Sequence, residues 1–200
     1  MEIESLFSST RWEIIKALAN EKLSPMELAS KTKTTSANIS QQLRLLELAG
    51  LVRSEKTSNV ERGKPRVVYT LAGDMAFLIL SSPHFADKKL LSLTEYHNFI
   101  MRSWFLDNLE HHSLVTDFYT KIKDIIHNID VIVASSTPKE LTIYIIEDKK
   151  LDSVIKKSLS DLKKVRILFV TQEELKKKYS PDLIVLYDPY YRYSEVVGSV

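Results

Sequence analysis

Apolar residues recur at helical spacing in residues 34–52, a stretch that reads TTSANISQQLRLLELAGLV. One stripe follows the i, i+4, i+7 spacing of a buried helix face: Ile39, Leu43 and Leu46. Thr35 or Ser36 can cap the start of this helix, and Gly50 can close its end in the left-handed conformation. The side chains that point away from the stripe are small or polar, so the pattern predicts one packed face and one face that can hydrogen-bond a partner.

Two shorter helices precede this one. We expect the first to begin near Ser9 or Thr10, because Thr10 and Glu13 match a capping box. The second has an N-cap serine, an N1 proline and an N3 glutamate in register: Ser24, Pro25 and Glu27. Only a short polar turn at residues 32–34 separates the second helix from the third, so these two helices are predicted to form a helix-turn-helix.

A hairpin is predicted after the three helices. Its first strand is expected at residues 51–56, and residues 66–71 (RVVYTL) are a β-branched and aromatic return strand. The polar loop between the strands carries Gly63, and residues 60–65 form the expected wing. The order helix, helix, helix, hairpin is that of a winged helix.

The middle of the chain is predicted to be mainly helical. Residues 74–80 fit a helix that Ser81, Ser82 and Pro83 break, and residues 89–93 fit a strand. Two longer helices are expected at residues 94–109 and 112–126, where apolar residues return at near-helical spacing.

Strands and helices alternate in the last third of the chain. Strands are predicted at residues 130–135, 140–146, 165–171 and 183–187, and helices at residues 151–163 and 172–179. Such alternation indicates a small α/β domain with a partly parallel sheet. The predicted class is α+β in three parts: a winged helix-turn-helix domain (residues 1–80), a helical connector or dimerisation region (81–128), and an α/β regulatory or dimerisation domain (129–200).

Composition narrows the function classes. The chain is 44% hydrophobic and 27% charged, and none of its apolar runs approaches the roughly 20 residues that a bilayer span needs, so no membrane partner is expected. Residues 1–7 carry two glutamates and no basic residue, so we expect no secretion signal there. Cysteine is absent, which excludes disulfides, thiolate metal sites and cysteine nucleophiles and points to the cytoplasm.

The net charge of +2 is unevenly distributed. Residues 31–66 contain three acidic side chains, Glu47, Glu55 and Glu61, against eight basic ones. The basic ones are Lys31, Lys33, Arg44, Arg53, Lys56, Arg62, Lys64 and Arg66. Such a local excess is typical of a surface that faces phosphates. Residues 74–197 contain no glycine, so glycine-rich phosphate-binding loops are excluded there.

Residues 8–73 resemble the ArsR-type winged helix-turn-helix of prokaryotic transcription regulators, especially archaeal ones. The features that carry the resemblance are the helix from Trp12 to Leu18, the start signal at residues 24–29, the stripe of the third helix, the LAGLV closure at residues 48–52, and the basic wing before Val68, Tyr69 and Thr70. The resemblance implies a homodimer that binds double-stranded DNA. It also implies that the first helix and the helices beyond the wing pair the two subunits.

Site residues follow from this resemblance and from side-chain chemistry. Asn and Gln can pair with adenine in the major groove, so base contacts are expected from the polar face of the third helix: Ala37, Asn38, Gln41 and Arg44. Phosphate contacts are expected from the turn, the helix start and the wing: Lys33, Thr35, Ser36, Ser40, Gln42, Arg62, Lys64 and Arg66. For each of them, a solvated side chain without a partner is the alternative.

Metal sensing is known in the resembled family, but the thiolate pair of its arsenic and cadmium sensors is missing here. The remaining candidate ligands are His97, His111, His112 and Asp117. Adjacent histidines on a helix diverge by about 100° and cannot easily share one ion. We therefore expect no metal and no other cofactor.

An enzymatic C-terminal domain is the competing class of explanation. A minimal nucleotidyltransferase would carry Gly-Ser and then paired carboxylates on one strand to hold magnesium. The corresponding region here, residues 134–136 and 142–146, has no acidic pair, and Glu147 and Asp148 fall at a strand end. The sequence therefore predicts a domain without catalytic activity that senses a small-molecule effector of unidentified chemistry or joins two subunits.

The expected function is a sequence-specific, cytoplasmic transcription regulator that acts as a homodimer on double-stranded DNA. A nonspecific chromatin- or RNA-binding protein is the nearest alternative, and a nucleotide-processing enzyme is the other.

Overall fold

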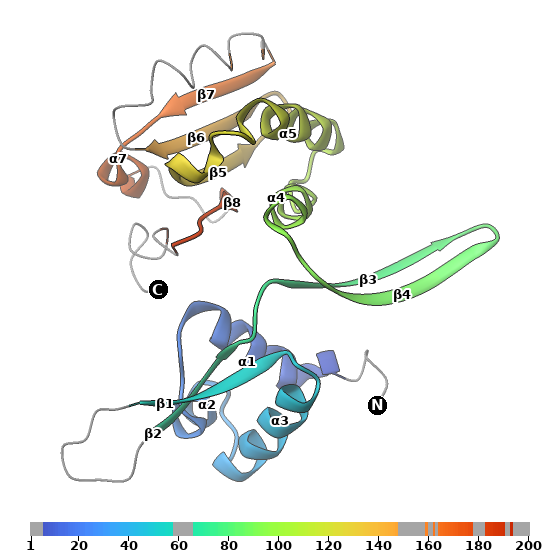
Figure 1. Ribbon diagram of the computed structural model, residues 1–200, viewed down its shortest axis with the longest axis vertical. Helices are drawn as coiled ribbons and strands as arrows, with labels where there is room; N and C mark the ends of the chain where they lie inside the picture. The colour runs from blue at the N-terminus through green and yellow to red at the C-terminus, as the bar shows by residue number, and fades with distance from the viewer. Residues whose placement is uncertain are drawn as a thin grey trace. The chain divides into compact units, whose positions relative to one another are not determined.

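The computed structural model of the protein describes residues 6–57, 66–147, 159, 162, 164–177, 183–190 and 193. Contacts divide the chain between Leu93 and Thr94 into two compact units. Helices and sheets occur in both, with an N-terminal winged helix-turn-helix and a C-terminal sheet domain (Figure 1), so the predicted α+β class is confirmed. None of the helices in the described ranges is long and apolar enough to cross a membrane.

The first unit begins with three helices and a two-stranded sheet. The helices are α1 (Ser9–Asn20), α2 (Pro25–Lys31) and α3 (Ser36–Leu48), and the antiparallel strands are β1 (Val52–Thr57) and β2 (Arg66–Leu71). Leu23, between α1 and α2, forms a bridge with Tyr69 on β2 through backbone hydrogen bonds of 3.1 and 2.8 Å. This bridge ties the sheet to the helix-turn-helix. The expected wing at residues 60–65 lies outside the described residues.

Leucine and isoleucine side chains form the core between the three helices. Ile39, Leu43 and Leu46 are fully buried, as their spacing predicts, and they pack with Ile14 and Leu28. Burying each such side chain stabilises the fold by about 1.5–3 kcal/mol. The stripe therefore determines which face of α3 turns outward.

Residues 75–92 form a separate antiparallel hairpin of two strands, β3 (Met75–Ser82) and β4 (Phe85–Ser92). The prediction of a helix over residues 74–80 is wrong. A short apolar run such as MAFLIL fits a helix or a strand equally well, and here its pairing with β4 makes it a strand. Met75 and Leu90 at the base pack against the core of the first unit, and the ring of Phe77 stacks on Phe7 with centroids 5.3 Å apart.

The second unit packs helices on a four-stranded sheet. Its helices are α4 (Glu95–Ser103), α5 (Leu109–Ile122) and α7 (Gln172–Lys177), and its strands are β5 (Ile129–Ser136), β6 (Leu141–Glu147), β7 (Val165–Phe169) and β8 (Leu183–Tyr187). The strand order is β7-β6-β5-β8, with β6 and β7 parallel and the other pairs antiparallel. The predicted partly parallel sheet is thus present. The helix predicted at residues 151–163 lies, apart from residues 159 and 162, outside the described residues.

The two helices predicted as a connector belong to the core of the second unit. Phe99 on α4 and Phe118 on α5 stack with centroids 6.4 Å apart and pack against the sheet through residues such as Ile132. The continuous helix predicted over residues 94–109 ends at Ser103, and Asn108 caps a new helix. By contacts, the chain divides between Leu93 and Thr94. The division by role into a binding, a connecting and a regulatory part remains a prediction.

Candidate nucleic-acid interface

Helix α3 has well-defined ends. The Thr35 hydroxyl accepts a hydrogen bond from the Asn38 backbone N–H at 3.2 Å, so Thr35 is the N-cap. At the other end, the N–H of Gly50 donates to the carbonyl of Glu47 at 3.0 Å, and that of Leu51 to Leu46 at 2.9 Å. These two bonds form a Schellman motif, in which Gly50 takes a φ of 72°.

The turn between α2 and α3 repeats this motif with a lysine in the glycine position. The N–H of Lys33 donates to Ser30 at 3.4 Å, and that of Thr34 donates to Ala29 at 3.0 Å. Lys33 accordingly has a φ of 54°, in the left-handed region that disfavours side chains with a Cβ. Its side chain is exposed. The helix-turn-helix therefore holds a cation at its turn against a backbone preference for glycine.

The outward face of α3 is exposed to solvent and carries polar side chains. Ala37, Gln41 and Arg44 are exposed and follow one another at i, i+4 and i+7 on the side opposite the buried stripe. Within the described residues, neither the Gln41 amide nor the Arg44 guanidinium has a hydrogen-bond or ion-pair partner. These two predicted base-contacting residues are therefore exposed, with their polar groups available to a partner.

Other predicted contact residues on α3 have hydrogen-bond partners within the helix or in the turn before it. The Asn38 amide donates to the Thr34 hydroxyl at 3.0 Å and accepts from the Gln42 amide at 3.1 Å. The Ser40 hydroxyl donates to the Ser36 carbonyl at 2.8 Å. Asn38 and Gln42 are half-buried, whereas Thr35, Ser36 and Ser40 are exposed. These two bonds use one N–H and one oxygen lone pair of the Asn38 amide and fix its orientation beside the open face of α3.

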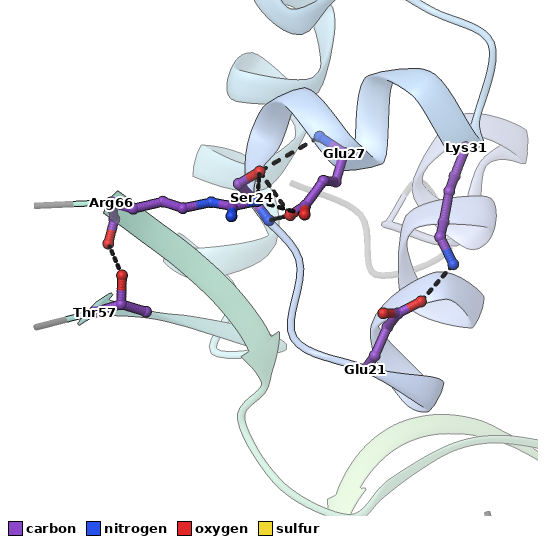
Figure 2. Close-up of polar contacts among 6 residues, drawn as sticks. All are labelled: Glu21, Ser24, Glu27, Lys31, Thr57 and Arg66. Atoms are coloured by element: carbon purple, nitrogen blue, oxygen red, sulfur yellow. Dashed lines mark hydrogen bonds and ion pairs between the residues drawn. The ribbon is translucent and has the colours of Figure 1, made fainter. Parts of the chain in front are cut away.

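Arg66, predicted to contact phosphate, is engaged by the capping box of α2 (Figure 2). Its guanidinium forms an ion pair with Glu27 and donates to the Ser24 hydroxyl at 3.1 Å. The Glu27 carboxylate also accepts from the Ser24 backbone N–H at 2.8 Å. The Ser24 N–H, the Arg66 guanidinium and the Ser24 hydroxyl together lower the pKa of Glu27 to about 2. Arg66 thereby links the start of β2 to the start of α2.

The basic residues of this region divide by their partners. Lys31 pairs with Glu21 at 2.5 Å (Figure 2) and Arg53 with Glu55 at 3.4 Å. In contrast, three basic side chains have no acidic partner among the residues that the structure covers: Lys33, Arg44 and Lys56. Arg62 and Lys64 of the predicted wing lie outside the described residues.

Lys56 belongs to the basic stretch of residues 31–66 but was not among the predicted DNA contacts, and the structure makes it a further candidate. It is exposed near the end of β1, on the same face of the strand as Ser54 because side chains alternate. The Ser54 hydroxyl donates to Glu47 on α3 at 2.7 Å, so this face of β1 adjoins α3. The strand alternation alone, applied to residues 52–56, would have placed Lys56 on the α3 side.

The histidines considered as metal ligands have other partners. His111 is buried and lies 2.8 Å from the Ser136 hydroxyl, and His112 lies 3.0 Å from the Leu106 carbonyl. His97 lies 2.8 Å from the Thr94 hydroxyl. Burial lowers the pKa of His111, which favours its neutral form. Across the described ranges, no three His, Cys, Asp or Glu side chains gather in a way that could hold a metal ion.

A pocket with a volume of about 440 Å³ lies among the described residues of the second unit. It lies between α5, the β5–β6 turn and the start of β7, and its charged lining comprises Glu110, Lys139, Glu140, Lys164 and Arg166. His111 also lines the pocket, and the Arg166 guanidinium lies 3.7 Å from the Glu140 carboxylate. The mixed charge suits a small polar molecule more than an apolar one.

Comparison with known proteins supports the helix-turn-helix assignment of the first unit. Residues 8–54, about a quarter of the chain, match the family model described as bacterial regulatory protein, arsR family. The matched segment contains α1, α2, α3 and the first residues of β1. No curated protein matches the chain. The match supports a DNA-binding transcription regulator, and that family is one of regulators and not of enzymes.

Proposed function

We propose that this protein is a sequence-specific transcription regulator that acts as a homodimer on double-stranded DNA. The arsR-family match over the helix-turn-helix supports the general class. The single observation that carries the specific proposal is the outward face of α3, where Gln41 and Arg44 are exposed and have no polar partner among the described residues.

The N-terminal half of α3 enters the major groove in this proposal. Gln41 pairs with adenine, Arg44 pairs with guanine, and Ala37 contacts a thymine methyl group, in keeping with the usual preferences of these side chains. Asn38 joins the readout in the orientation that its bonds to Thr34 and Gln42 fix. Thr35, Ser36, Ser40 and Gln42 bind phosphate oxygens beside the groove.

Cations around the helix supply affinity that is common to all sequences. Lys33, Lys56 and the wing residues Arg62 and Lys64 neutralise phosphates, and each contact releases counterions. Lys33 is the clearest case, because a lysine at a left-handed position is disfavoured unless its side chain contributes something that glycine lacks. Arg66 has a different role in this proposal: it holds β2 against α2 and so orients the wing.

The second unit modulates the dimer in this proposal and has no catalytic activity. The pocket beside His111 supports binding of a small polar effector. Exposed apolar side chains at the corner between α4 and α5, Trp104, Phe105 and Leu109, support a contact surface on the helices that the family resemblance links to dimerisation. The protein acts in the cytoplasm.

Selection of genomic fragments by the full-length protein tests the proposal. Fragments of equal length are bound at about 150 mM salt, recovered and sequenced, and the enriched ones are footprinted. We expect a shared pseudo-palindrome whose half-sites lie about one helical turn apart, bound at least 10³-fold more tightly than random duplex. Equal recovery of all fragments would contradict the proposal.

Each alternative function has its own experimental signature. A nonspecific chromatin protein binds random and genomic duplex equally, and an RNA-binding protein prefers RNA competitor over duplex DNA. An enzyme would turn over nucleotides with magnesium, and robust turnover by wild type that disappears in a variant of the second unit would favour that class.

A further inference from the structure

The β3–β4 hairpin is an apolar arm that extends from the first unit (Figure 1). It is a two-stranded sheet with no third strand among the described residues. Isolated two-stranded hairpins are only marginally stable in water. Yet this one exposes large apolar side chains near its turn: Ile79 is 67% exposed, Leu80 60% and Phe85 52%. Because side chains alternate along a strand and opposed residues share a face, Leu80 and Phe85 lie on one face of the hairpin and Ile79 on the other. Apolar side chains are therefore exposed on both faces near the turn, and such exposure is a feature of interaction surfaces.

The two edges of the hairpin differ in charge. β3 reads MAFLILSS and carries no charged residue, whereas β4 reads FADKKLLS and carries Asp87, Lys88 and Lys89. Charged side chains, lysine above all, are a common means of preventing an edge strand from pairing with another chain. The edge of β4 is protected in this way, and the edge of β3 is not.

The two edges also differ in the hydrogen bonding of their outward-pointing backbone groups. The N–H of Leu93 donates to Asp74 at 3.0 Å, and because hydrogen-bonded pairs alternate along an antiparallel ladder, the polar backbone groups of Phe77, Ile79 and Ser81 point away from β4. Lys88, directly opposite Ile79, donates its outward N–H to the Asp87 carboxylate at 2.8 Å. The outer edge of β4 thus has a local acceptor for this donor, while the outer edge of β3 faces no strand in the described chain.

We propose that β3 pairs antiparallel with β3 of a second copy of this chain, across a two-fold axis. The result is a four-stranded sheet in the order β4-β3-β3-β4. A two-fold interface brings the same surface of both copies together, and a strand without charge meets its equivalent without like-charge repulsion. The lysines of both β4 strands stay at the outer edges, where they stop further pairing.

This pairing deepens the proposed function, because it names a surface that joins the two subunits of the homodimer. It is the alternative to the helical dimer surface that the family resemblance implies, and in this inference β3, not the α4–α5 corner, holds the two subunits together. The other occupants of the β3 edge would be the second unit of the same chain, which leaves the protein monomeric, or an unrelated protein.

Molar mass in solution, measured by light scattering, tests the pairing with two matched variants of the full chain. Ile79→Pro removes an outward N–H of β3, and Lys88→Pro removes the outward N–H directly opposite on β4, so neither variant removes a bond of the β3–β4 ladder. We expect wild type and K88P at twice the 23.0 kDa chain mass and I79P at the chain mass. A monomeric wild type, or a dimeric I79P, would overturn the proposal.

Two further variants keep the test decisive. If circular dichroism shows I79P to be unfolded, Ile79→Lys replaces it, since a lysine blocks the edge without a backbone change. Phe105→Lys, at the α4–α5 corner, probes the helical surface in parallel. Dimers that survive I79K but dissociate in F105K would assign the interface to the helices and reject β3.

Cross-linking supplies an independent measurement. The chain has no cysteine, so single cysteines can be introduced without interference. Opposed residues of antiparallel strands lie close enough for a disulfide. We expect at least one of F77C, I79C and S81C to form a covalent dimer on mild oxidation, and A86C and K88C to remain monomeric on denaturing gels. Cross-linking of the β4 variants alone would contradict the pairing.

The outcomes also separate this inference from the proposed function. If wild type pairs through β3 but selects no genomic fragment, the regulator proposal fails and the pairing stands. If wild type selects operators and I79P remains a dimer, the pairing fails and the regulator proposal stands.

Discussion

Glu27 on α2 and Arg66 on β2 form an ion pair that joins the helix-turn-helix to the strand leaving the wing. Glu27 completes the capping box of α2 with the same carboxylate, so one side chain stabilises both a helix start and a strand position. The Arg66 carbonyl, in turn, accepts from the Thr57 hydroxyl at 3.0 Å across the base of the wing (Figure 2). The geometry of the wing base therefore depends on Glu27.

Glu27→Gln should lower stability in a pH-dependent way. The pKa of Glu27 falls from 4.5 to about 2 in the folded protein, so its ionised form stabilises the fold above about pH 4.5 and this contribution is lost as the pH falls toward 2. Because the side chain is 44% exposed, we expect a loss of only about 1 kcal/mol in E27Q at pH 7. The gap between wild type and variant should close as the pH approaches 2.

Urea unfolding followed by Trp12 fluorescence measures this effect, in a Trp104→Phe background so that only the first unit reports. Glu13→Gln is the control, because Glu13 forms only an exposed pair with Lys16 on α1 and should change stability by less than about 0.5 kcal/mol. A gap of the same size at pH 7 and near pH 2 would contradict the role of the Glu27 charge.

Lys33→Gly should raise stability while weakening DNA binding. Glycine adopts the left-handed φ of 54° without a Cβ clash, and its greater freedom in the unfolded chain offsets part of the gain, so about 0.5–1 kcal/mol is expected. Loss of one phosphate contact should lower the slope of log affinity against log salt by about one. Gly50→Ala, at the equivalent position after α3, should instead destabilise the protein and leave that slope unchanged. A variant K33G with an unchanged slope would remove Lys33 from the interface.

Gln41→Ala should reduce preference among operator sequences more than it reduces bulk affinity. A lost base contact is worth about 1–3 kcal/mol at the cognate position and nothing on random duplex. Competition between the selected operator and base-substituted versions measures this difference. Ser40→Ala, which removes a proposed phosphate contact, should weaken binding to all duplexes alike. Equal weakening by Q41A on every sequence would exclude Gln41 from the readout.

Lys56→Ala should lower the salt slope by about one, whereas Lys31→Ala should not. The two lysines differ in their partners: Lys31 pairs with Glu21, and Lys56 has no acidic partner within the described part of the chain. Lys64→Ala in the wing carries the same expectation as K56A. Identical slopes for K56A, K31A and wild type would show that β1 lies away from the phosphates.

The helix-turn-helix could be predicted from the sequence because local signals agree with the packing. Ser24 and Glu27 form the predicted capping box, Thr35 caps α3, and Gly50 closes it. The box predicted from Thr10 and Glu13 is absent: α1 is capped at Ser8, which makes no side-chain cap bond. The expected start near Ser9 or Thr10 is confirmed, because α1 begins at Ser9, but Thr10 is already helical and therefore cannot be the N-cap.

The β3–β4 hairpin could not be predicted because its turn lacks the usual signal. Pro83 and His84 occupy a two-residue turn, and His84 takes a φ of 66° where glycine or asparagine would be expected. Without that signal, the apolar run of β3 and the charged residues of β4 gave no sign of pairing. The residues of the candidate site could be predicted from their side-chain types. Which basic side chains form ion pairs could not, because the acidic partner can lie far away in the sequence, as Glu27 does for Arg66.

The hydrogen-bonded chain of Thr34, Asn38 and Gln42 has a consequence for how α3 would meet a duplex. Holding a long side chain in one rotamer at an interface costs about 0.5–1.5 kcal/mol, and here part of that ordering is complete once the protein has folded. A flank that is rigid in advance adapts poorly to a mismatched groove. Sequence discrimination by α3 would then arise as much from the poor fit of noncognate DNA to this rigid flank as from the hydrogen bonds formed with cognate DNA.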